Sequence, residues 1–168
     1  MTETTDRLAL PLLNAAQAQK EMYHNEALVR LDLLTQAAAE GVGANTPPID
    51  PQPGRCWIIG DAPEGAWRGR AGEVAGWTEG GWRFVTPLEG MRLWLGRGAG
   101  HALFTNGGWR AGEVHGRLIV EGQQVIGARA TAIPEPEGGT VVDAAARAAI
   151  SAVLVALRAH GLIEEGGL

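Results

Sequence analysis

The hydrophobic and polar positions change their spacing twice along the chain, which divides the sequence into three parts. From Leu13 to about Glu40, apolar residues recur at steps of three and four, at Tyr23, Ala27, Leu31, Leu34 and Ala38. This spacing predicts an amphipathic helix. Asn14 is a suitable N-cap for its start, and Gly41 and Gly43 are expected to end it.

The segment that follows, residues 45–54 (NTPPIDPQPG), contains four prolines. Proline lacks an N–H donor and fixes φ, so this segment is predicted to be an extended, stiff connector. Such a linker would let the N-terminal helix reach a neighbouring molecule.

Residues 55–133 alternate short runs of strand-forming residues with glycine-rich turns. The runs are RCWIIG, EVAGW, WRFVTP, MRLWLG, HALFT and RLIVEG, and turns such as TEGG, TNGG and EGQQ separate them. Turn signals at intervals of about ten residues are typical of antiparallel hairpins in a small all-β unit.

The last part, residues 134–168, returns to helical spacing. Asp143 or Thr140 is expected to cap a helix that runs to about His160, and Gly161 ends it. An a/d pattern of about two and a half heptads forms an apolar seam on this helix. The seam must pack either on the β unit or on copies of itself, and its candidate oligomer-interface residues are Ala146, Ile150, Val153 and Leu157.

The predicted fold is therefore α+β, with an N-terminal helix, a small antiparallel Trp/Gly-rich β unit and a C-terminal amphipathic, coiled-coil-like helix. The expected organisation is a helical anchoring arm (residues 1–44), a Pro-rich linker (45–54), a β-rich domain (55–133) and a C-terminal oligomerisation helix (134–168).

The charge balance and the scarcity of catalytic motifs narrow the classes of function. Lys and Arg number 14 against 19 Asp and Glu, a net charge of -5, which disfavours a nucleic-acid or anionic-membrane partner. One cysteine, Cys56, excludes an internal disulfide and a cysteine-based zinc site. The four histidines are scattered, and no hydrolase or nucleotide-binding motif is present. We therefore expect no enzyme activity, no cofactor and no metal. A glycosidase would need a pair of carboxylates across the sugar, and nothing in the sequence singles out such a pair among Glu73, Glu79, Glu89 and Glu113.

Six tryptophans are the one compositional excess in the chain. Most of them are expected to supply the core of a small β unit that has few other large side chains. Trp57 and Trp94 lie in the middle of apolar runs and are predicted to be inside. The alternative is that exposed indole faces stack on the apolar faces of sugars, and the candidates beside glycine turns are Trp67, Trp82 and Trp109.

Three segments of the sequence resemble a known domain family. LALPLLNAAQAQKEMYHNEALVRLD (Leu8–Asp32), GAWRGRAGEVAGWTEGGWRFVTPLEG (Gly65–Gly90) and the tail Val125–Ile163 are similar to an uncharacterised family of bacterial prophages and gene transfer agents, whose members include tail-fibre and head-spike proteins. The resemblance carries over no catalytic residues.

The resemblance implies a structural virion protein, assembled in the bacterial cytoplasm as a homo-oligomer. Its expected role is a subunit, in the base of a head spike or fibre, that contacts a capsid or tail protein and a spike or fibre protein. Candidate virion-docking residues are Gln17, Gln19, Lys20, His24 and Asn25. The alternative is a carbohydrate-binding module that attaches the particle to capsular or cell-surface polysaccharide.

Overall fold

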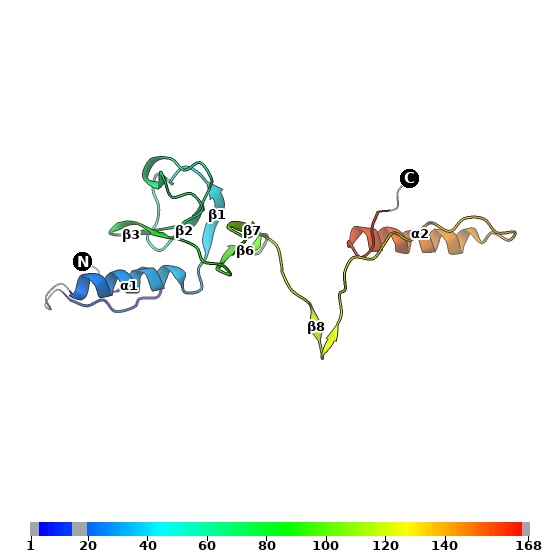
Figure 1. Cartoon of the computed structure of the whole chain (residues 1–168), viewed down its shortest axis with the longest axis horizontal. Coiled ribbons are helices and arrows are strands. Elements are labelled where there is room, and N and C mark those ends of the chain that lie inside the picture. The colour runs from blue at the N-terminus through cyan, green and yellow to red at the C-terminus, as the bar shows by residue number, and fades with distance from the viewer. Residues whose placement is uncertain (1–3, 15–19, 166–168) are drawn as a thin grey trace. The chain divides into compact units, whose positions relative to one another are not determined.

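The computed structural model describes residues 4–14 and 20–165 of the chain. It divides into two compact units, Met1–Val114 and His115–Leu168 (Figure 1). Two helices and small, mainly antiparallel sheets confirm the predicted α+β class. The units divide near residue 114 and not at 133, because the main sheets end with Ala111 and the residues after them belong to the second unit.

The first helix, α1 (Lys20–Leu34), is shorter at its C-terminus than predicted. Gln36, the second residue after it, adopts a positive φ of 48°, a conformation that cannot continue a right-handed helix. The Arg7 guanidinium donates hydrogen bonds to the carbonyl oxygens of Asp32, Leu33, Thr35 and Gln36. The helix therefore ends where a side chain from the N-terminal segment satisfies its free carbonyl groups.

Strand β1 (Ala39–Ala44) lies where the sequence pattern predicted the end of the helix. Gly41 and Gly43, expected as helix-ending glycines, are inside this strand, so that prediction was wrong. Burial alternates over residues 37–40, where Ala37 and Ala39 are buried while Ala38 and Glu40 are exposed, as expected for extended backbone that leads into the strand.

The remaining strands of the first unit form two sheets. A four-stranded sheet has the order β1-β2-β3-β4, and a three-stranded sheet has the order β5-β6-β7. Their bounds are β2 (Cys56–Ile59), β3 (Val74–Thr78), β4 (Gly81–Val85), β5 (Arg92–Gly96), β6 (Gly100–Thr105) and β7 (Gly108–Ala111), with a short 3-10 helix at Gly65–Trp67. The predicted hairpins are present, and Asn106 and Gly107 between β6 and β7 both have positive φ, as a type I′ turn requires.

The Pro-rich segment is a crossover within the first unit and not a linker between parts. β1 and β2 pair in parallel, so residues 45–55 must carry the chain back to the starting end of the sheet. Hydrogen bonds fix both ends of this crossover: Gly54 N donates to Trp77 O, and Glu64 N donates to Asn45 O, each at 2.8 Å. The expectation of a helical arm that reaches out on an extended linker was therefore wrong.

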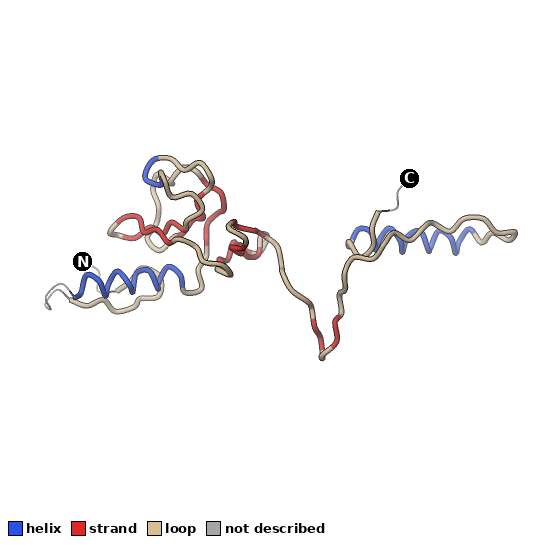
Figure 2. The backbone as a smooth tube through the Cα atoms, viewed as in Figure 1, coloured by secondary structure: helices blue, strands red, loops and turns tan. Residues whose placement is uncertain are grey.

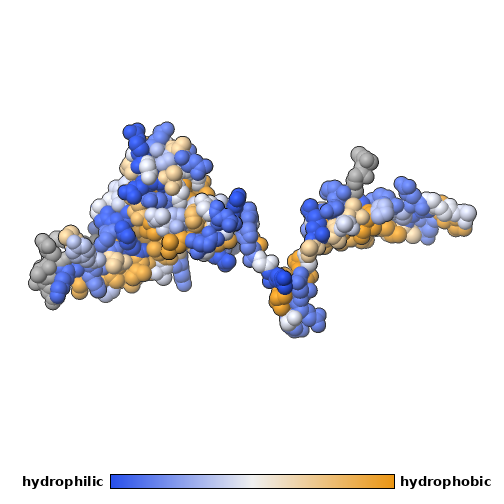
Figure 3. Space-filling view, viewed as in Figure 1, coloured by the Kyte–Doolittle hydropathy of each residue, from blue (hydrophilic) through white to orange (hydrophobic). Residues whose placement is uncertain are grey.

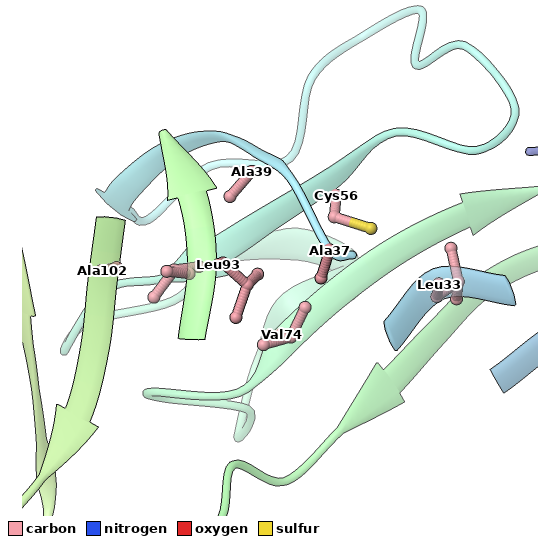
Figure 4. Close-up of a cluster of buried hydrophobic side chains, with 8 residues drawn as sticks. Leu33, Ala37, Ala39, Cys56, Val74, Leu93 and Ala102 are labelled. Atoms are coloured by element: carbon pink, nitrogen blue, oxygen red, sulfur yellow. The ribbon is translucent and has the colours of Figure 1, made fainter. Parts of the chain in front are cut away.

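The core of the first unit joins α1 to both sheets (Figure 4). Leu33 of α1 is buried against β3, where Gly76 has no side chain. A Cβ at Gly76 would lie 2.5 Å from Leu33 Cδ1, so glycine permits this close approach of helix and strand. The other buried members of this core are Ala37, Ala39, Cys56, Ile58, Val74, Leu93 and Ala102.

The second unit consists of a short hairpin, an extended segment and a helix (Figure 2). β8 (Ile119–Val120) pairs with β9 (Gln123–Gln124), and α2 spans Ala144–Ala159. Asp143 caps α2 by accepting a hydrogen bond from Ala146 N, and Gly161 follows with a positive φ, as predicted. Residues 129–138, which we call the strap, run alongside α2 and are held by Arg147 and Arg158.

Candidate functional site

Four tryptophans form an edge-to-face cluster: three come from strands of the four-stranded sheet, and Trp67 comes from the 3-10 helix. Trp82 lies between its neighbours, with ring centroids 5.5 Å from Trp57, 5.2 Å from Trp67 and 5.0 Å from Trp77. Trp67 is 0 % exposed, so its prediction as a sugar-stacking residue was wrong: the 3-10 helix turns it into the core. Trp82 is half-buried, and its packing against three indoles indicates a role in the core.

Trp109 lines a cleft of about 360 Å³ beside the three-stranded sheet. Its indole Nε1 donates to Gly72 O at 2.8 Å, and its ring packs edge-on against Phe104 with centroids 5.3 Å apart. Asn45 and Asp61 also line the cleft and are exposed. Trp109 therefore stays a candidate sugar-stacking residue, since it borders a cleft that polar side chains also line.

Trp94 has the exposed indole that the sequence analysis placed inside. It is 41 % exposed because β5 alternates: Leu93 points into the core and its neighbours Arg92 and Trp94 point out. The indole packs edge-on against His101, with centroids 4.9 Å apart. A cleft of about 270 Å³ beside this pair is lined by Leu34, Gln36, Ala37, Arg92, Trp94 and His101. Strict alternation around Leu93 was the sequence signal that could have found it.

The candidate docking residues of the N-terminal segment differ in their surroundings. Gln17 and Gln19 lie outside the described residues. The side chain of Asn25 is hydrogen-bonded within the chain: its amide oxygen accepts a hydrogen bond from Leu13 N at 2.9 Å, and its amide nitrogen donates one to Leu13 O at 3.0 Å. Lys20 and His24 are exposed on α1.

The apolar stripe predicted for the first helix also faces outward. Tyr23 is 78 % exposed, and Ala27 and Leu31 are exposed too, because Val29 and Leu33 on another side of α1 supply the contacts with the core. Helical spacing places five exposed residues on one side of α1. We call this surface the outer face of α1; it consists of Lys20, Tyr23, His24, Ala27 and Leu31.

The candidate oligomer-interface residues of α2 are mostly uncovered. Ala146, Ile150 and Val153 are exposed and Leu157 is half-buried, while Leu154 is buried on an adjacent side of the helix. In the space-filling view, apolar residues extend along one side of this unit (Figure 3). A row of aliphatic side chains that face solvent is a candidate interaction surface.

Carboxylates near the tryptophans take part in local structure. Both oxygens of Glu89 accept hydrogen bonds, from Thr105 Oγ1 at 2.6 Å and from Asn106 N at 3.0 Å, which fixes the β6–β7 turn. Glu73 lies 3.5 Å from Arg70 and accepts from Thr86. Among the described residues, no group of three His, Cys, Asp or Glu is placed to hold a metal ion. No described helix combines the length and the apolar character needed to cross a membrane.

These features define a small α+β protein with a tryptophan-rich first unit and an apolar second unit. Residues 24–110, just over half of the chain, match the family described as "Protein of unknown function (DUF2793)". The chain belongs to this family. The matched segment runs from within α1 to within β7 and lies in the first unit. No curated protein matches the chain.

Proposed function

We propose that the chain is a non-catalytic structural protein of a gene transfer agent or phage-like particle. In this role it is a subunit in the base of a head spike or fibre and anchors a receptor-binding appendage. The resemblance of Leu8–Asp32 to proteins of prophages and gene transfer agents supports the kind of particle. The family match itself names no function.

The observation that carries this proposal is the small number of hydrophobic residues that the second unit buries. Leu154 and Ile163 are its buried hydrophobic residues among those described, whereas many of its other aliphatic side chains face solvent. A unit of this size with so small a core needs additional partners to be stable. A protein that is completed by other subunits suits an assembled particle.

The outer face of α1 is the proposed surface that docks on a capsid or tail protein. It combines a cation and an imidazole, Lys20 and His24, with the exposed side chains of Tyr23 and Leu31. A mixed apolar and polar surface of this kind is typical of non-obligate interfaces, in which a buried aromatic residue is often an energetic anchor.

Imaging of particles tests the proposal. Particles from cells that lack this protein should lose a projection that wild-type particles carry. A Tyr23→Asp, Leu31→Glu variant should fold but be absent from purified particles, whereas Ile49→Glu, at a fully exposed aliphatic residue of the same unit, should be incorporated normally. Unchanged projections in the deletion strain would contradict the proposal.

The exposed indole of Trp94 favours a second candidate function, carbohydrate binding by the first unit. Arg92, His101 and Gln36 line the same cleft as this indole and offer hydrogen-bond donors and acceptors. A pyranose that stacked on this indole would meet these groups at its rim, as in other small-ligand sites that combine an apolar wall with few polar groups.

Binding to capsular polysaccharide tests this second function. Trp94→Ala should weaken binding at least tenfold without lowering the melting temperature, since the indole is on the surface. Trp109→Ala is the matched comparison for the other cleft, and its loss of the bond to Gly72 should also lower stability. A glycan array without signal for the wild-type chain would exclude carbohydrate binding.

A further inference from the structure

The three-stranded sheet differs in charge from the rest of the chain. Residues 91–112, which contain β5, β6 and β7, include three arginines and one histidine and no aspartate or glutamate, although the whole chain has a net charge of -5. The acidic residues are therefore concentrated outside this sheet. A molecule with this distribution attracts anions to one part of its surface and repels them from the remainder.

The strand pairing places the cationic side chains and one indole on the same face of this sheet. Leu93 of β5 pairs with Ala102 of β6, and both are buried. Because side chains alternate along a strand, the residues on either side of this pair point away from the core. Ala111 of β7 pairs with Ala102 in turn, which places its neighbour on the outward side as well. The outer face of the three-stranded sheet consists of Arg92, Trp94, His101, Leu103 and Arg110.

The arginines of this outer face are not neutralised by carboxylates of the described chain. No ion pair joins Arg92 or Arg110 to an acidic residue within residues 4–14 and 20–165. Several arginines outside this sheet do form such pairs: Arg30 and Arg83 with Glu26, Arg55 with Glu40, and Arg70 with Glu73. The outer face therefore offers two guanidinium groups to an external anion.

The cleft at Trp94 combines this charge with a stacking surface. Arg92 and His101 line it together with the indole, and no acidic residue is among the described residues of its lining. The cleft at Trp109 has the opposite charge, since its charged lining residue is Asp61. A guanidinium group matches the two oxygens of a carboxylate, and an indole offers an apolar ring face. The cleft at Trp94 is therefore suited to a ring that carries a carboxylate.

Hydrogen bonds fix the walls of this cleft within the folded chain. Trp94 N donates to Ala37 O at 2.8 Å, and Ala38 forms an isolated parallel bridge with Trp94. The segment after α1 is thereby attached to β5. The Arg7 guanidinium donates to Gln36 O at 3.1 Å and supports the positive φ of that residue. A site whose walls are already ordered loses less conformational entropy when a ligand binds.

From these observations we infer that the outer face of the three-stranded sheet, with the cleft at Trp94, binds an acidic polysaccharide through its uronic acid units. One sugar ring stacks on the indole of Trp94 and its carboxylate pairs with Arg92, while Arg110 contacts a further carboxylate of the same polymer. The inference rests on the carbohydrate binding proposed above as the second function, and it names the class of ligand. The net negative charge of the chain and the one exposed indole of this sheet favour an acidic polysaccharide over a nucleic acid, whose successive bases need several stacking rings.

Titration calorimetry of the full-length chain with two matched oligosaccharides tests the inference. A galacturonic acid tetramer should bind, and the neutral galactose tetramer should bind about tenfold more weakly, because it lacks the carboxylates that pair with arginine. Salt screens charges at an exposed site. An increase from about 50 mM to about 500 mM NaCl should therefore weaken binding of the acidic tetramer several-fold and leave binding of the neutral tetramer unchanged.

Variants of the outer face separate the ionic contact from stacking. Arg92→Gln should weaken binding of the acidic tetramer by about three- to tenfold at low salt, and this difference from wild type should disappear at high salt. Its melting temperature should stay unchanged, because the arginine is exposed. Trp94→Ala should weaken binding of both tetramers. Arg68→Gln, at an exposed arginine of the first unit that does not line the cleft, is the control and should bind like wild type.

The possible failures are distinguishable. Equal binding of the two tetramers, or wild-type affinity for Arg92→Gln, would overturn this inference and leave carbohydrate binding intact. A chain that binds neither tetramer would also overturn it, and a glycan array without signal would then exclude carbohydrate binding altogether. A thymidine oligonucleotide that binds more tightly than the acidic tetramer would assign this face to nucleic acid and overturn the inference.

Discussion

At the scale of single residues, the packing of α1 on the sheet depends on a glycine, which leaves room for a side chain of the helix. Gly76 of β3 lies under Leu33, and both are buried. Its φ is not in the left-handed region, so the requirement for glycine is one of space and not of backbone conformation. Leu33 contributes to the core that joins the helix to the sheets. A side chain added at Gly76 would therefore disturb the packing of α1 and of both sheets.

Gly76→Ala should destabilise the protein by about 1–3 kcal/mol, the usual cost of an added methyl group in a filled core. Leu33→Ala alone should cost about 2–5 kcal/mol through the cavity that it leaves. In the double variant the new methyl group enters that cavity, so the combined loss should be clearly smaller than the sum of the two. Urea unfolding of the four proteins measures this coupling, and strict additivity would show that the two residues do not compete for space.

The tryptophans show which residue-level properties follow from sequence. Alternation within a strand, as around Leu93, predicts which side chains share a face, and it identifies Trp94 as the opposite of Leu93. The burial of Trp67 does not follow from any local pattern. It depends on the 3-10 helix and on the neighbours Trp57 and Trp82, which come from other strands. Long-range contacts of this kind have no signature in the residues adjacent to Trp67.

At the scale of elements, the N-terminal segment is attached to α1 through two side chains. Arg7 binds carbonyl oxygens at the C-terminal end of the helix, and Asp32 accepts hydrogen bonds from the backbone N–H groups of Arg7 at 3.0 Å and Leu8 at 2.6 Å. The positive guanidinium also interacts favourably with the negative end of the helix dipole. This reciprocal arrangement fixes the segment before the helix to the residues at its end.

Arg7→Ala should lower the free energy of unfolding by about 1–3 kcal/mol, since several carbonyl oxygens lose a charged donor. Arg7→Lys should restore little of this, because an ammonium group cannot reach the same acceptors with a planar fork. Arg97→Ala, at an exposed arginine of the β5–β6 turn, is the control. Thermal unfolding measures all three, and equal melting temperatures for the Arg7 and Arg97 variants would refute the capping role.

The strap is attached to α2 through Glu135, and this attachment should depend on pH. Hydrogen bonds from Arg158 at 2.9 Å and from Ser151 at 2.7 Å hold the pKa of Glu135 below its ordinary value of 4.5. The hydrogen bonds of Glu135 therefore contribute fully to stability above pH 4.5. This contribution is lost as the pH falls through the lowered pKa that Glu135 has in the folded protein. The protection of amides in residues 129–138, measured as hydrogen exchange relative to the intrinsic rate at each pH, should therefore fall in that acidic range. Glu135→Gln should show no such dependence there, and Glu137→Gln should behave like wild type.

The two helices differ in how well their limits could be predicted. Asp143 and Gly161 are local signals and bound α2 as expected, because a cap acts within its own turn. The end of α1 depends on Arg7, a residue more than twenty positions earlier, and on the pairing of β1 with β2. Helix propensity in the alanine-rich stretch 37–39 was overridden by this tertiary pairing.

At the scale of the whole molecule, the two units differ in what stabilises them. The first has two hydrophobic clusters of its own, around Leu93 and around Trp67, whereas the second buries little. A chain truncated after Val114 should therefore keep its melting temperature within a few degrees and become monomeric. Differential scanning calorimetry and light scattering measure these two properties. Unfolding of the truncated chain would show that the first unit depends on the second.

The division at Val114 has a consequence for avidity. The assembly proposed for this chain, held together through the second unit, would display one copy of the first unit per chain and so the same number of clefts at Trp94 and Trp109. A repeating surface polymer offers many equivalent attachment points, so a contact that is weak for one copy is strengthened by about 10²–10⁴ when several engage together. Selection on such a molecule would act on the number and spacing of its copies as much as on the affinity of any one of them.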